Sequence, residues 1–266
     1  MLLRIAHRTR YAYDAPVASG LDQMRLTPKS RETQSVREWR VDVEGGRIEA
    51  EYDDHHANRV TLVGFEPGTE SLNVVCEGVV ETTDTSGVVG AHRGFAPLWL
   101  FLRETALTEA GEGLRALADE VGGGGSDPIG RLHALSAAVA GAIDYRKGET
   151  DARTTAEEAL AGGAGVCQDH AHAFCAAARL LGHPARYVSG YLHMDGRDEQ
   201  EATHAWAEAH VDGIGWVGFD VSNGISPDDR YVRIATGLDY GEAAPVFGVR
   251  AGAGGESLDV AVQVQQ

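Results

Sequence analysis

The chain has 266 residues, with 23 Lys or Arg against 40 Asp or Glu, so its formal net charge is -17. This acidity, without a basic stripe, makes nucleic acid and anionic membranes poor partners. The three cysteines have no regular spacing, which favours a reducing compartment. The first residues are charged and lack the apolar stretch of a signal peptide, and no apolar run reaches bilayer length. We therefore expect a cytoplasmic protein that does not enter membranes.

The first third of the chain alternates apolar and polar residues, which is typical of β-strands with one wet face. Residues 39–44 alternate, Gly45-Gly46 supplies a turn, and residues 48–52 resume the alternation, so an antiparallel hairpin is expected. Further strands are expected over residues 60–65 and 72–80. Residues 1–85 are therefore predicted to form a small antiparallel β-sandwich domain.

Helical spacing replaces this alternation after residue 82. Ser126-Asp127-Pro128 is a helix-start signature, with proline at the first helical position. The apolar residues that follow it at helical intervals are Ile129, Leu132, Leu135, Val139 and Ile143. A less regular helix is expected over residues 108–121, ending at the glycine run 122–125. A short helix is expected after Thr155, because Thr155-Ala156-Glu157-Glu158 has the spacing of a capping box.

The next predicted helix begins near Cys167 and carries an apolar stripe that stops at Gly182-His183-Pro184. Strands are expected beyond it over residues 186–193, 204–211, 216–221 and 231–235, with a last strand over 257–265 that could return to either domain. Residues 86–266 are therefore predicted to form a second domain. The predicted fold class is α+β, with the sandwich followed by a core in which helices pack on an antiparallel sheet.

Cys167 follows Gly165 at the start of a predicted helix, a position that suits a nucleophile. The unpaired N–H groups of a first helical turn and the helix dipole stabilise a thiolate. The same groups, including the N–H of Cys167, can hold the oxyanion that forms when a thiolate attacks an amide carbonyl. Cys175 lies on the apolar stripe and is expected to be buried, neutral and inert. Cys76 lies in an apolar strand and is expected in the core of the sandwich.

A thiolate nucleophile needs a proton shuttle, and His204 is the best-placed histidine. Over residues 204–210 the large or polar side chains share one strand face and alanines fill the other, so the alanine face should pack tightly under a helix. The alternation by itself leaves His204, Glu208 and His210 equally eligible.

The following strand favours His204, because it ends near Asp220. Asp212-Gly213 and Gly215 predict a tight turn that brings Asp220 back beside His204 or one pair away. The two side chains share a face only if this turn has an odd length or one strand carries a bulge, and we predict one of these. An aspartate in that place would fix the imidazole tautomer and stabilise the imidazolium of a Cys-His ion pair.

Several strings of the sequence resemble the transglutaminase-like superfamily, which has a papain-like fold, and in particular its bacterial members with an extra N-terminal β-domain. The strings are Gly165-Val166-Cys167-Gln168-Asp169-His170-Ala171-His172, residues 185–191, His204-Ala205-Trp206-Ala207-Glu208 and Trp216-Val217-Gly218-Phe219-Asp220, together with residues 7–13 and 25–30 of the N-terminal part. The resemblance covers nearly the whole chain.

This resemblance implies that Cys167 is the nucleophile, His204 the general base and acid, and Asp220 the orienting carboxylate. It further implies a thioester intermediate on Cys167 and a peptide or protein amide as substrate, with the enzyme acting as a cysteine protease, an amidase or a transglutaminase. The chain departs from the family in two places. Val221-Ser222 precedes Asn223 where Pro-Thr is usual, and His170 replaces an aromatic residue, which implies a more polar and pH-sensitive pocket wall.

The sequence leaves other interpretations open. A transglutaminase-like fold could serve as a non-catalytic module that binds a peptide or protein, although an intact triad favours an enzyme. Metal binding is disfavoured, because Asp169 and His172 point to a different side of a helix from His170, and residues 53–56 are expected to be a turn. The acidic loop 195–199 is expected to be an exposed loop rather than a calcium site. No metal or other cofactor is predicted, and the oligomeric state is open.

Overall fold

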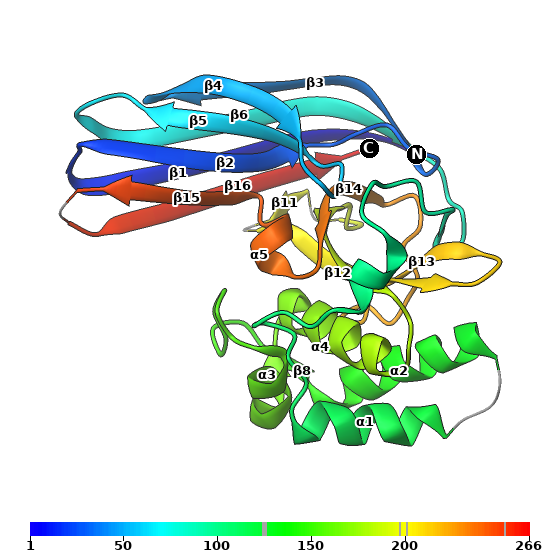
Figure 1. The fold of residues 1–266 in the computed structure, drawn as a ribbon. Helices are drawn as coiled ribbons and strands as arrows, with labels where there is room; N and C mark the ends of the chain where they lie inside the picture. Colours follow the sequence, from blue (N-terminus) through cyan, green and yellow to red (C-terminus); the bar gives the residue numbers. More distant parts are fainter. Residues whose placement is uncertain (124–126, 197, 201, 253) are drawn as a thin grey trace.

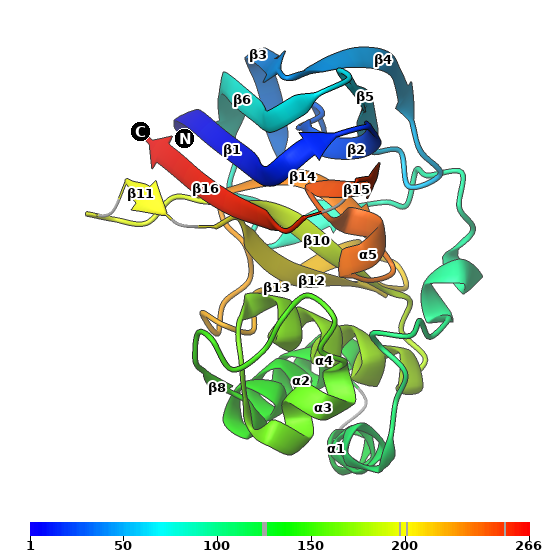
Figure 2. The same ribbon diagram turned by 90° about the vertical axis from the view of Figure 1, so that its left-hand side faces the viewer.

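A computed structural model of the chain describes residues 1–123, 127–196, 198–200, 202–252 and 254–266. Most of the helices lie at one end, a central sheet lies in the middle, and a two-sheet β-sandwich lies at the other end (Figures 1 and 2). The fold class is therefore α+β, as predicted. Within the described residues, no helix is both long enough and apolar enough to cross a bilayer.

The N-terminal sandwich consists of two antiparallel sheets. The five-stranded sheet has the order β11 (Glu199–Gln200), β16 (Glu256–Gln265), β1 (Leu2–Val17), β6 (Thr69–Thr82) and β3 (Gln34–Glu44). The four-stranded sheet has the order β15 (Val246–Ala251), β2 (Ser19–Thr27), β5 (Arg59–Phe65) and β4 (Gly46–Asp53). The last strand pairs with β1, and β15 pairs with β2, so the end of the chain lies in the sandwich. The division into domains at residue 85 stays a prediction.

The turn at Gly45 joins the two sheets of the sandwich and does not close a hairpin. β3 pairs with β6, whereas β4 pairs with β5 in the other sheet. The predicted hairpin between these strands is therefore wrong, although both strands and the turn are present. Alternation and a glycine turn specify two strands that reverse direction, but they do not specify whether those strands pair or pack face to face.

A comparison of Gly45 with Gly68 tests how tightly the chain is packed at the turn that joins the two sheets. Both have φ of +84°, but a Cβ on Gly45 would lie 2.1 Å from the Ser71 carbonyl oxygen, whereas Gly68 has nothing within 4 Å. We expect Gly68→Ala to destabilise the fold by about 1–2 kcal/mol, the conformational cost of a left-handed residue. Gly45→Ala should cost clearly more, because the backbone must also move. Urea unfolding of both variants measures the difference, and equal losses would refute the crowding at Gly45.

One face of the five-stranded sheet covers two different partners. Near the chain termini, Leu3, Val80 and Val264 pack with Tyr191 and Val232 of the central sheet. Farther along the same strands, a second group packs against the four-stranded sheet and consists of Leu72, Val74 and Cys76 with Met24, Leu26 and Val63. Cys76 is fully buried, as predicted.

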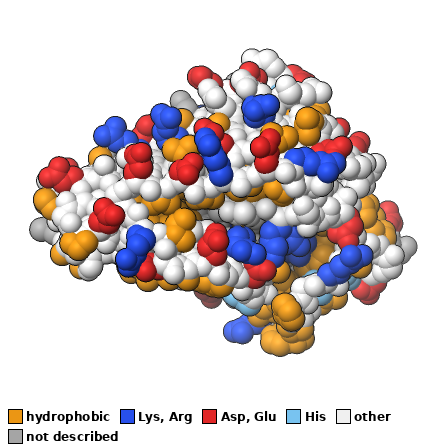
Figure 3. All heavy atoms as spheres, turned by 90° about the horizontal axis from the view of Figure 1, so that it is seen from above, with side chains coloured by type: hydrophobic (Ala, Val, Ile, Leu, Met, Phe, Trp, Pro, Cys, Tyr) orange, Lys and Arg blue, Asp and Glu red, His pale blue; other side chains and the backbone are white. Residues whose placement is uncertain are grey.

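The surface of the sandwich carries charges of both signs. Seen from above the view of Figure 1, acidic and basic side chains are interspersed on it (Figure 3).

The central sheet is antiparallel and has the order β14 (Tyr231–Gly237), β10 (Ala185–Leu192), β12 (His204–Val211), β13 (Gly215–Phe219) and β7 (Val88–Gly90). Its alanine face, formed by Ala205, Ala207 and Ala209, packs against helix α4 (Cys167–Leu180), which confirms the prediction for this strand. Small side chains on both surfaces allow the helix to approach the sheet closely. The helix thereby acquires a fixed position over β12.

The other long helices pack around α4, and α2 and α3 begin where the sequence predicts. Asp127 accepts the backbone N–H groups of Ile129 and Gly130 at the start of α2 (Pro128–Ala142), and Thr155 and Glu158 form the predicted capping box of α3 (Ala156–Gly162). The less regular helix is α1 (Glu112–Gly122), which begins four residues later than expected. Part of the predicted glycine break at 122–125, and Ser126 of the helix-start signature, lie outside the described residues. Short elements complete the chain: η1 (Leu98–Leu102), β8 (Asp144–Tyr145), β9 (Ala164–Gly165) and α5 (Tyr240–Ala243).

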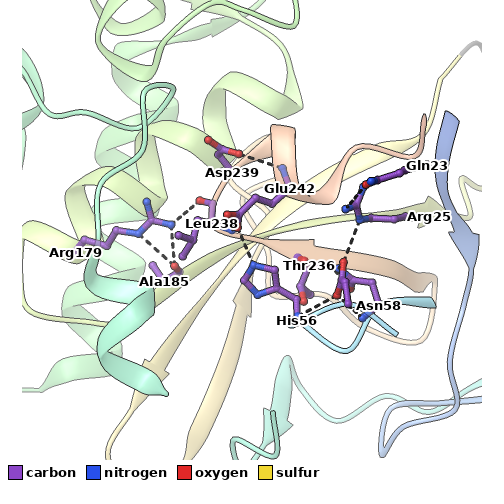
Figure 4. A network of polar contacts seen from close by, with 11 residues as sticks. Gln23, Arg25, His56, Asn58, Arg179, Ala185, Thr236, Leu238, Asp239 and Glu242 are labelled. Atoms are coloured by element: carbon purple, nitrogen blue, oxygen red, sulfur yellow. Dashed lines mark hydrogen bonds and ion pairs between the residues drawn. The ribbon is translucent and has the colours of Figure 1, made fainter. Parts of the chain in front are cut away.

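A polar seam fixes the sandwich to β14, the edge strand of the central sheet. The Asn58 side chain donates to the Thr236 carbonyl and accepts the Thr236 N–H, each at 2.8 Å, and Gln34 makes the same pair of bonds with Arg233. Figure 4 shows Asn58 beside Thr236, and His56 beside Glu242 of α5. The two amide side chains thus satisfy backbone groups that an edge strand would otherwise leave unpaired.

Candidate active site

The hairpin of β12 and β13 places Asp220 on the same side of the sheet as His204. Val211 pairs with Gly215, so the loop between the strands has three residues, Asp212, Gly213 and Ile214. This is the odd length that the sequence analysis required. Continued from the Ala207–Phe219 pair, the register puts Asp220 opposite Trp206, two residues from His204 and therefore on its face.

Asp220 is a fully buried carboxylate that accepts hydrogen bonds from three side chains. Its Oδ2 atom accepts from His204 Nε2 at 2.6 Å, from the Tyr231 hydroxyl at 2.7 Å and from Asn223 Nδ2 at 2.7 Å. Its Oδ1 atom accepts the Asn223 N–H at 3.2 Å. Burial raises the pKa of Asp220, but these donors outweigh burial and hold the pKa below its ordinary value. The aspartate is therefore a rigid anion that orients His204.

His204 lies between Asp220 and Cys167. Burial alone lowers the pKa of His204, but hydrogen bonds with the Asp220 and Cys167 side chains, together with their negative charges, raise the pKa to about 10. The Nε2 atom is bonded to Asp220, which leaves Nδ1 for the thiol. At neutral pH this environment favours an imidazolium next to the sulfur.

Cys167 is the first residue of α4 and is partly exposed. The first turn is fixed by Asp169, whose Oδ2 accepts the Val166 N–H and the Thr150 hydroxyl, both at 2.7 Å. A Cβ on Gly165 would lie 2.7 Å from the Asp169 side chain, so glycine is needed for this close approach. The thiol therefore occupies a rigid helix start, with the first-turn N–H groups close to it.

A cavity of about 560 Å³ exposes both Cys167 and His204. Its other lining residues include Tyr145, Lys147 and Met194. A cavity of this size accommodates a peptide segment or a comparable ligand. The nucleophile candidate and the proton-shuttle candidate thus meet at a surface that a substrate can reach.

His170 does not line this cavity. It is buried, its Nε2 donates to the Ile143 carbonyl at 2.8 Å, and its Nδ1 accepts the Ser222 hydroxyl at 2.8 Å. His170 is therefore not itself part of the cavity wall, contrary to the inference from sequence, but lies buried behind Ser222, which does line the cavity. The bond to Ser222 instead ties α4 to the loop that follows Asp220.

The other residues considered for the site lie in different surroundings from Cys167 and His204. Glu208 is buried in ion pairs with Arg186 and Arg233, and His210 stacks edge-on against Trp216, so neither shares the position of His204. Cys175 is fully buried, as predicted, and burial raises the pKa of its thiol to about 12.

The possible metal ligands on α4 serve structural roles. Asp169 holds the helix start, and His172 accepts the Tyr240 N–H at 3.0 Å while burial lowers its pKa to about 3. Residues 54–58 form the expected turn between β4 and β5. Possible ligand atoms of His55, His56 and Glu242 lie within 4.8 Å of one another, a grouping that the sequence analysis missed because Glu242 is distant in sequence.

Two aromatic residues of the site were not predicted from the sequence to have a role there. Tyr231 donates to Asp220 from β14, and Trp206 stacks against the His204 ring at a centroid distance of 6.3 Å. Trp206 shares the face of His204 in the strand pattern, which marks it as a neighbour. Tyr231 comes from another strand, so only its pairing through β10 brings it to the site.

Two family descriptions match separate parts of the chain. Residues 115–221 match "Transglutaminase-like superfamily", a segment that contains Cys167, His204 and Asp220. Residues 3–81 match "Bacterial transglutaminase-like N-terminal region", which corresponds to most of the sandwich.

Relatives match the chain over nearly its full length. An uncharacterized protein of Mycobacterium leprae is 30% identical, with 98% of each chain covered. An uncharacterized protein of Mycobacterium tuberculosis is 26% identical over 92% of this chain and 86% of that protein. A solved structure from Cytophaga hutchinsonii, described as a "Putative Cysteine Protease", has a TM-score of 0.80 at 21% identity and covers 100% of this chain and 90% of its own. This likeness shows that the two proteins share a fold.

Proposed function

The chain belongs to the transglutaminase-like superfamily, and from this premise we propose that it is a thiol-dependent acyl-transfer enzyme. In this proposal Cys167 is the nucleophile, His204 is the general base and acid, and Asp220 is the orienting carboxylate. The substrate is a peptide or carboxamide bond of a peptide or protein. The observation that carries the proposal is the position of His204, which contacts Cys167 on one side and the buried Asp220 on the other.

The proposed reaction follows from these contacts. The Cys167 thiolate attacks the carbonyl carbon, and the electron pair of the C=O bond moves to the oxygen, which the first-turn N–H groups of α4 stabilise. When the oxyanion collapses, the C–N bond breaks and the imidazolium of His204 gives its proton to the leaving nitrogen. Water or an amine then attacks the thioester and gives a proton back to His204, which regenerates the thiolate.

A mass-spectrometric assay with peptide substrates tests the proposal and separates its branches. Wild-type protein is incubated with a mixture of Gln-containing peptides, with and without an added primary amine. Cleavage alone identifies a protease, a mass gain equal to the amine minus ammonia identifies a transglutaminase, and conversion of Gln to Glu identifies an amidase. No change to any peptide would count against the enzyme and favour a binding module.

Thiol labelling of the native protein tests the nucleophile without any substrate. We expect iodoacetamide to modify Cys167 rapidly at mildly acidic pH, because the helix start and the His204 imidazolium stabilise its thiolate. Cys175 and Cys76 are fully buried, and burial raises the pKa of each to about 12, so both should stay unmodified until the protein unfolds. Peptide mapping distinguishes the three, and equally slow modification of Cys167 and Cys175 would contradict the assignment.

The raised pKa of His204 also predicts a pH dependence of stability. The folded-state value of about 10 lies above the ordinary 6.5, so protonation stabilises the fold. This contribution is complete below pH 6.5 and is lost as the pH rises through about 10. Urea unfolding at pH 7 and pH 10 should therefore show a loss of stability that is smaller in His204→Gln. An equal loss in both proteins would show that His204 does not titrate in this range.

A further inference from the structure

A second cavity, of about 510 Å³, lies between the sandwich and the central sheet. Its walls come from the β4–β5 turn, from residues 30–32 between β2 and β3, from the segment 89–101, and from one residue each of β10, β13 and β14. Among the residues that the structure describes, it has no lining residue in common with the cavity of Cys167 and His204. It is therefore a separate site.

The lining of this cavity is cationic, although the chain as a whole is strongly acidic. Arg31, Arg93, Arg186 and Arg233 line it, whereas Glu32 is its acidic lining residue. Glu32 already pairs with Arg93 at 2.8 Å. An arginine cluster in a chain with a net charge of -17 cannot be explained by general surface composition.

The arginines at the floor exceed the carboxylates available to them. Glu208, beneath the cavity, pairs with both Arg186 and Arg233, whose side chains are 9% and 6% exposed. The positive charge of Arg31 also acts on Glu208, with Glu32 and Asp53 as further carboxylates close to it. Burial and repulsion from Arg233 lower the pKa of Arg31. Arg186 and Arg233 therefore share one buried carboxylate, and buried positive charge in excess of its partners is costly unless an anion completes it.

The geometry leaves donors for such an anion. Arg186 uses Nε and Nη2 for Glu208, and its guanidinium lies 4.0 Å above the Trp216 ring, which fixes its plane. The Nη1 atom of Arg186 takes part in neither of these two bonds. Arg31 contributes one long bond, from Nη2 to the Ala57 carbonyl at 3.5 Å.

We propose that this cavity is a binding site for a small oxyanion, a phosphate or carboxylate group, held by Arg31, Arg186 and Arg233. The planar fork of arginine matches both groups, because it can give two hydrogen bonds to the same group. A divalent cation is disfavoured at the neighbouring His55 and His56, because the arginines of the same cavity repel it.

Isothermal titration with inorganic phosphate and with citrate, at low ionic strength, tests the site. We expect one equivalent of at least one anion to bind wild-type protein, and Arg31→Gln to weaken that binding about tenfold or more, since it removes a charged hydrogen-bond donor. Stronger binding of phosphate identifies a phosphate ligand, and stronger binding of citrate a carboxylate ligand. Arg40→Gln, on the exposed outer face of β3, is the matched control and should bind as wild type.

Wild-type protein that binds neither anion, or Arg31→Gln that binds as tightly as wild type, would overturn the site. If Arg31→Gln does not fold, crystals of wild-type protein soaked in tungstate decide the question by anomalous scattering. Tungstate in the cavity beside Arg186 and Arg233 supports the proposal, and tungstate found only elsewhere refutes it. The same titration on Cys167→Ala separates this site from the proposed enzyme, because anion binding should persist whether or not Cys167 is a nucleophile.

Discussion

Replacement of Cys167 by alanine is expected to lower the rate of peptide conversion by at least about 10⁴-fold, because the variant lacks the atom that forms the thioester. The fold should remain, since Cys167 is partly exposed at the first position of α4 and its helix start is held by Asp169. The measurement is the single-turnover rate by mass spectrometry, together with thermal unfolding. Wild-type protein should also show a transient mass gain on Cys167, and Cys167→Ala should not.

Cys175→Ala is the matched control for this prediction. Cys175 lies two turns further along the same helix, is fully buried and packs in the core. Its replacement should lower stability by about 1–2 kcal/mol through the lost burial, with little effect on turnover. Activity retained in Cys167→Ala, or lost equally in both variants, would show that the reaction does not depend on the Cys167 thiol.

Asp220→Asn is expected to lower turnover by about 10⁴-fold while leaving most of the fold intact. The asparagine amide matches the shape of the carboxylate but removes the charge that His204 Nε2–H meets at 2.6 Å. If the amide N–H donates to His204 Nε2, the imidazole proton moves to Nδ1, so the ring can no longer accept a proton from the thiol. Loss of the anion also lowers the pKa of His204 from its value of about 10.

The pH dependence distinguishes this effect from general damage. In wild-type protein, activity that depends on the imidazolium should fall as the pH rises through about 10, and in Asp220→Asn this fall should occur at a lower pH. Asp212→Asn, in the exposed loop of the same hairpin, should leave rate and profile unchanged. An unchanged profile in Asp220→Asn would show that Asp220 does not set the charge of His204.

The local elements of the fold were predictable because each depends on neighbours in sequence. The capping box at Thr155, the proline at the start of α2 and the alanine face of β12 all follow from short-range geometry or from a repeating pattern. The pairing of β3 was not predictable in this way. A glycine turn specifies that the chain reverses, whereas the choice between pairing and packing depends on β5 and β6.

The residues of the candidate site also differ in whether they could be predicted from the sequence. Cys167, His204 and Asp220 were proposed from the sequence, because a predicted helix start marks Cys167 and a predicted hairpin brings Asp220 close to His204. The structure decided that an odd loop of three residues puts His204 and Asp220 on one face. Tyr231 was missed, since its contact with Asp220 depends on the position of β14 in the sheet. His170 was expected at the cavity wall but lies behind Ser222, because helical periodicity does not say which loop covers a side chain.

By itself, the sequence determined the elements, the α+β class and the three residues proposed for catalysis, since periodicity, capping and loop length act over short distances. The tertiary structure alone decided how the aspartate is held and that Arg31, Arg186 and Arg233 converge on Glu208. The physical reason is that charges and hydrogen bonds act through space. Their strength depends on burial and on partners from distant parts of the chain, which no local pattern records.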